Sequence, residues 1–251
     1  MLRIAPAPAA ALQEAILTDI TDVGESTTLF TDIRPTIVQC LLRHAIAEVI
    51  SEGIFNSLIV SNSAEANLEL TSIHERLLTR TFPSHSLKHT SDAGHVFLFS
   101  GDVTAAAVWR RHTFSVAVEN LTPEITRMIF EKNMPLLAAL LPDSAENPLG
   151  TRGVLEDAFE FSRKLRGAGP NADALYRSFV PKLASTVHPG LIELVKPCRR
   201  SERGEVDRVG ATVFPGLFEI LPTPPVVQTV VRRAQVICEC ELLATSNLVW
   251  E

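Results

Sequence analysis

Residues 35–50 read PTIVQCLLRHAIAEVI, and this stretch decides the expected fold. Its apolar residues recur at steps of three and four, which is the period of one face of an α-helix. Pro35 suits the first helical turn, because the N–H that proline lacks would have no partner there. We therefore expect a helix that starts at Pro35 and ends or kinks near Gly53. Its apolar stripe is Val38, Leu41, Leu42, Ala45, Ile46, Val49 and Ile50, and the opposite side carries Gln39, Arg43, Ala47 and Glu52.

The same helical period recurs along much of the chain. Asn62 followed by Glu65 resembles a capping box and predicts a helix to about Arg80. Thr122-Pro123-Glu124 is a typical helix start, with a capping hydroxyl and a proline in the first turn. Further helices are predicted from Asp102 or Thr104 onward, over 154–165, over 175–183, and briefly after Pro189.

The C-terminal third has a different pattern. Residues 209–220 are rich in β-branched and aromatic residues and contain glycine and proline, which predicts an edge strand or an irregular apolar segment. Residues 227–242 fit either a helix or a β-hairpin, with the helix slightly favoured by length. The expected fold class is mainly α: an irregular multi-helix bundle with a small β-like element or hairpin near the C-terminus.

These patterns divide the chain into four expected segments. They are a flexible N-terminal arm over 1–34, a helical pair over 35–80, a loop or insertion over 81–102, and a helical bundle with the C-terminal β-like segment over 103–251.

Composition narrows the possible classes of protein. Of the 251 residues, 46% are hydrophobic and 21% are charged, which excludes a mostly disordered chain. The 23 basic and 29 acidic residues give a net charge of −6, so a nucleic-acid partner is not expected. Charges interrupt every apolar run before it reaches membrane-spanning length. Four scattered cysteines and an N-terminal stretch unlike a signal peptide predict a cytoplasmic protein.

Few residues suggest chemistry. The sequence contains no glycine-rich phosphate loop, and no cofactor is expected. His74 begins a pattern like the zinc-protease helix, but Leu78 stands where the second histidine is needed, so we expect a structural His74 and likewise a structural His112. One expected loop contains three histidines, His85, His89 and His95, which are the histidines best placed to hold a metal. No acid or thiol near them stands at the spacing typical of a metal-binding motif.

Cys238 and Cys240 form a C-x-C pair. Residues two apart diverge on a helix and lie about 7 Å apart along one face of a strand. The other thiols, Cys40 and Cys198, are distant in the sequence. The favoured interpretation is therefore a pair of small buried residues and not a metal site.

One segment concentrates positive charge. Arg199, Arg200 and Arg203 lie there among acidic neighbours and are the candidate contacts for an anion or an acidic partner, because arginine recognises carboxylates and phosphates with paired hydrogen bonds. Arg110–Arg111 and Arg232–Arg233 are two further pairs that the fold can bring near them.

The leading functional hypothesis is a non-enzymatic, intracellular helical interaction or scaffold protein that binds a protein partner or a second copy of itself. The first alternative is a helical small-molecule-binding protein or enzyme with an apolar pocket that draws polar groups from His74 and His112. The second is a metal-dependent protein that uses the His85/His89/His95 loop.

Overall fold

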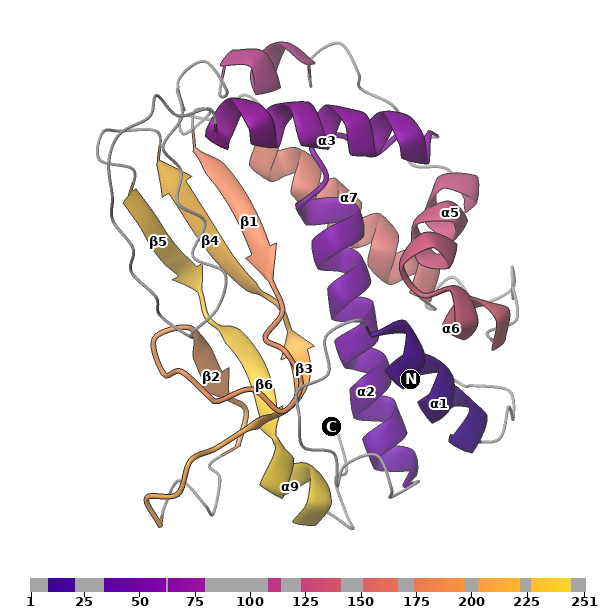
Figure 1. Cartoon of the computed structure of the whole chain (residues 1–251), viewed down its shortest axis with the longest axis vertical. Helices are drawn as coiled ribbons and strands as arrows, with labels where there is room; N and C mark the ends of the chain where they lie inside the picture. The colour runs from indigo at the N-terminus through magenta and orange to yellow at the C-terminus, as the bar shows by residue number, and fades with distance from the viewer. Residues whose placement is uncertain are drawn as a thin grey trace.

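The structure is a computed structural model that describes residues 9–20, 34–61, 63–79, 108–113, 123–140, 151–166, 174–196, 203–221 and 227–244. More than half of these described residues are helical, and the strands form two three-stranded sheets. The prediction of a mainly α bundle is therefore wrong. The fold is an α/β mixture, in which helices cover one side of the two sheets (Figure 1).

The helices account for most of the described N-terminal half. They are α1 (Ala9–Asp19), α2 (Pro35–Glu48), α3 (Ala64–Thr79), α5 (Pro123–Asn133), α6 (Pro135–Leu140), α7 (Thr151–Arg166) and α9 (Glu239–Ala244). A π-helix, Val49–Phe55, continues α2, and residues 108–113 are also helical. Among the described residues, no helix is long and apolar enough to cross a bilayer.

The strands are β1 (Leu175–Phe179), β2 (Ile192–Leu194), β3 (Val209–Phe214), β4 (Gly216–Leu221), β5 (Val227–Arg232) and β6 (Ala234–Cys238). One sheet has the order β1-β4-β5 and the other has the order β2-β6-β3. All pairs are antiparallel except β2 with β6.

A single bent ribbon joins the two sheets. β3 continues into β4 through Pro215, and β5 continues into β6 through Arg233. β4 pairs with β5 and β3 pairs with β6, so the ribbon bends where both strands are interrupted (Figure 1). Proline has no N–H for a ladder bond, which suits it to such a break.

Two predicted helices are strands instead. Residues 175–179 pair residue by residue with β4, and residues 192–194 pair with β6. The 227–242 stretch, for which the sequence slightly favours a helix, is two strands followed by the short α9. The β-like prediction for 209–220 is confirmed, because β3 and β4 occupy it.

Helix starts follow the sequence more closely. α2 and α5 begin at Pro35 and Pro123 as predicted, and the π-helix contains Gly53. At α3 the capping side chain is Ser63, whose Oγ accepts a 3.2 Å bond from the Ala66 N–H. Asn62, the predicted cap, lies outside the described residues.

The core lies on both sides of α2. One side packs against α1 and includes the fully buried Ile37 and Leu41, and the same core continues along the π-helix, which packs against α5 and α7. The other side faces β3, where Cys40 packs against Ala211, Ile237 and Leu242. Ala47, expected on an exposed side, is buried as well. The sheet therefore covers a face of α2 that the sequence, with one apolar stripe, predicts to be exposed to solvent.

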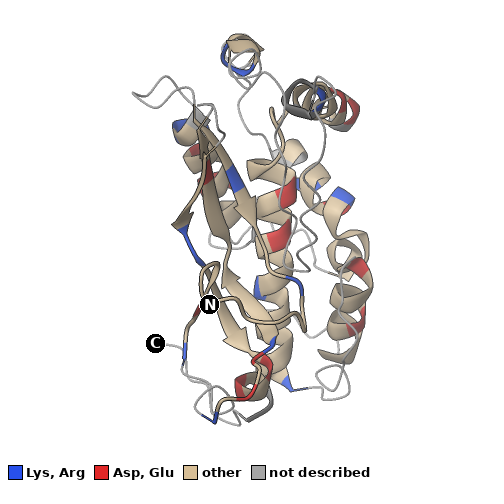
Figure 2. Cartoon of the chain, turned by 60° about the vertical axis from the view of Figure 1, so that its left-hand side comes forward, with Lys and Arg blue, Asp and Glu red and all other residues tan. Residues whose placement is uncertain are grey.

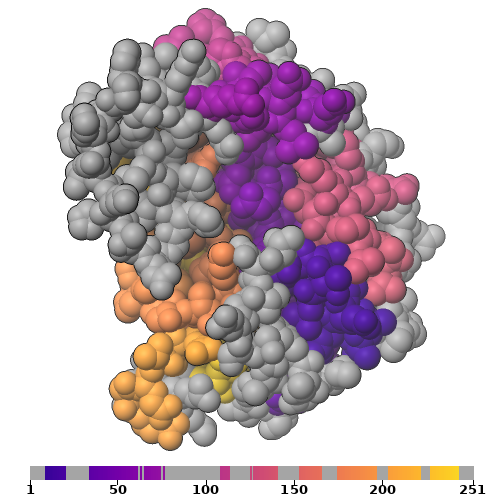
Figure 3. Space-filling model, viewed as in Figure 1, coloured from indigo at the N-terminus to yellow at the C-terminus, as the bar shows by residue number. Residues whose placement is uncertain are grey.

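Residues 9–19 of the arm expected over 1–34 form α1, which lies beside α2 and α6 (Figure 3). Asp19 at the end of α1 is buried and accepts the N–H groups of Leu136 and Leu137 at 3.2 and 2.8 Å. N–H groups in the first turn of a helix have no partner within the helix, so the Asp19 side chain of α1 caps the N-terminus of α6. The 81–102 loop lies outside the described residues.

Gly216 is required by close packing. A Cβ there would lie 2.2 Å from the Phe179 ring, which stacks on Phe218 at 4.4 Å.

We expect Gly216→Ala to lower the free energy of unfolding by about 1–3 kcal/mol, because the added methyl group overpacks the space next to the Phe179 ring. Urea denaturation measures the change. Gly190→Ala is the matched control, because a Cβ at Gly190 would meet no described atom within 4 Å beyond its chain neighbours. Equal losses in the two variants would contradict this explanation.

Candidate functional site

Asp207, Cys238 and Cys240 form the one group of potential metal ligands found among the described residues. Asp207 precedes β3, Cys238 is the last residue of β6, and Cys240 lies in the first turn of α9. One ligand atom of each lies within 4.8 Å of the others, and Asp207 and Cys238 are buried.

The change from strand to helix brings the two sulfurs together. The Sγ atoms of Cys238 and Cys240 are 3.2 Å apart, much closer than the spacing along a strand. The prediction of a separated pair assumes a continuous helix or a continuous strand, and the chain is neither here. The signal that could have found the pair is the acidic Glu239 and Glu241 in the first turn of α9, a feature of helix starts.

The surroundings of Cys238 favour its neutral thiol. Burial raises the pKa of the Cys238 thiol, and the Asp207 and Glu241 carboxylates raise it further, while backbone hydrogen bonds lower it. Cys238 and Cys40 are free thiols, whereas Cys240 is disulfide-bonded. Cys198, the remaining cysteine of the sequence, lies outside the described residues.

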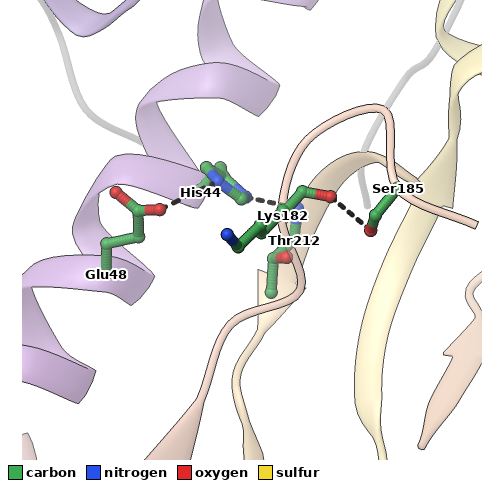
Figure 4. A network of polar contacts seen from close by, with 5 residues as sticks. All are labelled: His44, Glu48, Lys182, Ser185 and Thr212. Carbon is green, nitrogen blue, oxygen red and sulfur yellow. Dashed lines mark hydrogen bonds and ion pairs between the residues drawn. The ribbon is translucent and has the colours of Figure 1, made fainter. Parts of the chain in front are cut away.

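A second polar group joins α2 to β3. The His44 side chain is completely buried, and its Nδ1 accepts the backbone N–H of Thr212 at 3.1 Å. Because Nδ1 is an acceptor, the neutral ring carries its proton on Nε2, which faces the Glu48 carboxylate at 3.4 Å (Figure 4). The Ser185 hydroxyl donates to the Lys182 carbonyl at 2.6 Å in the adjoining turn. This group holds a helix to a sheet edge.

The predicted arginine contacts do not form one described site. Arg203 lies in an exposed turn with its Nε 3.5 Å from Glu205, and Arg199 and Arg200 lie outside the described residues. Arg110 is buried and Arg111 is exposed. Figure 2 shows basic and acidic residues interspersed over the described ribbon in that view.

The histidines are also dispersed. His74 is buried and stacks on Trp109 at 6.1 Å, as expected for a structural residue, whereas His112 is exposed. His85, His89 and His95 lie outside the described residues, so the metal hypothesis for that loop stays a prediction.

A comparison with protein-family models finds no match to this chain, and comparisons with curated proteins and with solved structures find none either. Function is therefore inferred from the geometry of the chain itself.

His44→Leu removes the acceptor of a buried N–H. We expect it to lower the free energy of unfolding by about 1–3 kcal/mol, because the Thr212 N–H is left without its partner. Glu48→Gln keeps the size of the side chain, and the Glu48 carboxylate makes no hydrogen bond to Nε2, so the change is expected to cost less than about 1 kcal/mol. Denaturant unfolding of both variants is the measurement, and a Glu48→Gln loss as large as that of His44→Leu would contradict the assignment.

Cys40 makes stability depend on alkaline pH. Burial raises its pKa from 9.0 to about 11, against a lowering by the nearby Arg43. The Cys40 pKa is higher in the folded protein than in the unfolded chain. Its contribution to the free energy of unfolding is therefore complete below the unfolded-state pKa and is lost as pH rises through the folded-state pKa. Between about pH 8 and about pH 10.5 we expect Cys40→Ala to lose less unfolding free energy than the wild type, by on the order of 2 kcal/mol. Identical pH profiles would refute this.

Proposed function

We propose that this chain is a non-enzymatic protein-binding protein whose strand β5 takes an extended, acidic segment of a partner protein. The observation that carries the proposal is that β5 differs from the other sheet edges. An edge strand offers backbone N–H and C=O groups to any chain that can pair with it.

The other edges are covered or short. At β1, the Asn56 side chain accepts the Ser178 N–H at 3.1 Å and donates to the Ser178 carbonyl at 3.2 Å, in place of a neighbouring strand. At β3, His44 accepts the Thr212 N–H. β2 has only three residues. Such covering and shortening are ways in which natural sheets block unwanted pairing.

β5 has no such protection within the described parts of the chain, where β4 is its only paired strand. It reads VQTVVR, six residues with three valines and no acid. Val227 is 44% exposed and Val231 is 53% exposed, so apolar side chains flank the open edge. A β-branched segment of this kind favours pairing with an extended chain.

The charge of the strand points to an acidic partner. The Arg232 guanidinium lies over the Phe214 ring, 5.2 Å from its centre, at the end of the strand. Arg233 follows it; its half-exposed guanidinium donates to the Pro189 carbonyl at 3.2 Å and lies 3.9 Å from the Glu193 carboxylate. Acidic side chains on a partner complement this basic end, and two copies of β5 lack any acid on the strand to do so.

Cytoplasmic residence is part of the same proposal. Its support is that Cys40 and Cys238 are free thiols, as in a reducing compartment. The disulfide of Cys240 is the feature that tests it. We expect Cys240 to be reduced when the protein is alkylated rapidly in cell extracts and analysed by mass spectrometry, and an oxidised Cys240 would place the protein in an oxidising compartment instead.

The binding test uses a fluorescein-labelled peptide of alternating valine and glutamate. We expect binding that slows amide hydrogen exchange in β5, and binding at least about tenfold weaker when glutamate is replaced by lysine. Changing Val227 and Val231 together to Asn is expected to weaken binding by about tenfold, because asparagine is unfavourable in strands and removes apolar contact.

Val154→Asn on α7 is the matched control, since Val154 is 43% exposed but lies on a helix. It should leave binding unchanged. Failure of the glutamate peptide to bind, or binding without slowed exchange in β5, would contradict the proposal. A concentration-dependent dimer that protects the β5 amides without peptide would show that a second copy occupies the edge instead.

A further inference from the structure

We propose that the cluster of Asp207, Cys238 and Cys240 binds a zinc ion once the disulfide of Cys240 is reduced. This site is separate from β5, and neither proposal depends on the other. It uses three ligand-bearing side chains that come from the approach to β3, the end of β6 and the start of α9.

The distances fit a tetrahedral ion. Two Zn–S bonds of about 2.3 Å at the tetrahedral angle place the sulfurs about 3.8 Å apart. In the structure they are 3.2 Å apart, and the carboxylate oxygen completes a group within 4.8 Å. A small increase in the distance between the sulfurs therefore gives the zinc geometry, which is within the reach of side-chain rotation.

The backbone holds the three ligands in place. Cys238 pairs with Val209 across the β3–β6 ladder, and the Glu239 N–H donates to the Arg208 carbonyl at 2.8 Å. The Asp207 carbonyl accepts the Val187 N–H at 3.0 Å. Ligands fixed by regular backbone bonds are preorganised for one geometry.

Gly210 makes this close approach possible. A Cβ at Gly210 would lie 2.9 Å from the backbone carbonyl carbon and oxygen of Cys238. Any larger residue would push β3 away from the strand that carries the first thiol. The glycine therefore contributes to the position of Cys238 relative to Asp207.

The donor set selects the kind of ion. Two sulfurs and one carboxylate suit zinc, whereas magnesium and calcium take oxygen ligands. Three protein ligands leave a fourth tetrahedral position for water or another donor.

Reduction of the disulfide comes before metal binding. A phosphine reductant gives two electrons to the disulfide of Cys240 and becomes a phosphine oxide, with oxygen and two protons from water, so that two thiols form. Zinc then replaces the thiol protons of Cys238 and Cys240, and two protons are released to solvent.

The test measures zinc bound to the whole chain after phosphine reduction. Reduced protein is incubated with Zn²⁺ alone, passed through a desalting column and analysed for metal, and Co²⁺ is used in parallel. We expect one equivalent of zinc and a sulfur-to-cobalt charge-transfer absorption in the near ultraviolet. Protein that has not been reduced should bind neither.

Variants assign the ligands. Cys238→Ser and Cys240→Ser are each expected to lower zinc affinity at least about 100-fold, beyond the roughly 10–100-fold typical of residues that only support a ligand. Asp207→Asn keeps the shape of the side chain and should weaken binding with the circular dichroism spectrum unchanged. Cys40→Ala is the control, because Cys40 is another buried free thiol, on α2.

Two results would overturn the site. One is the absence of stoichiometric zinc in the reduced wild type. The other is retention of zinc and of the cobalt absorption by Cys238→Ser and Asp207→Asn, since these variants remove ligands of different kinds. If Cys238→Ser does not fold, Asp207→Asn alone decides between the outcomes, because its shape is conserved.

Discussion

The arrangement of this protein depends on the burial of α2 on two faces. One face joins the helical layer through large aliphatic side chains such as Ile37 and Leu41. The other face meets β3 through the smaller Cys40 and through His44. The His44 side chain accepts the Thr212 N–H, which points away from the neighbouring strand at the edge of the sheet. A buried polar bond of this kind fixes one register, because any slip leaves the Thr212 N–H without a partner. The helix therefore positions both layers at once.

The sequence predicts helices well where local signals are sufficient. Prolines mark the starts of α2 and α5, and 3.6-residue spacing marks α7. It fails for β1, where Leu175, Tyr176 and Phe179 happen to fit helical spacing. The strand forms because β4, about forty residues later, offers a ladder and because Gly216 admits the Phe179 ring. Strand pairing of this kind overrides the local preference for a helix, and the sequence of β1 does not show the alternating pattern that would predict a strand.

The candidate sites are less accessible from sequence for a related reason. Charge density alone selects the arginines around Arg203, the one of the three that lies among the described residues, where it is exposed beside Glu205. In the sequence the C-x-C pair is unsuited to a metal, because a continuous helix or strand keeps the two cysteine side chains apart. In the structure β6 ends at Cys238 and α9 begins at Glu239, and this change brings the two sulfurs together. Among the described residues, β5 differs from the other edges only by comparison with them, since Asn56 and His44 cover the edges at β1 and β3 from distant positions in the sequence. The junction of two elements and the pairing of a strand are properties of the fold and leave no local signal in the sequence.

The two-faced burial of α2 also has a consequence for synthesis on the ribosome. The bond from Thr212 to His44 spans 168 residues of sequence. The sheet-facing side of α2 thus leaves the ribosome long before the strands that cover it, at the usual pace of several residues per second. During that interval Cys40 and its neighbours have no native cover. The nascent chain is most exposed to misassociation before the ribbon of β3 to β6 is complete, and the order of the elements along the chain sets the length of that period.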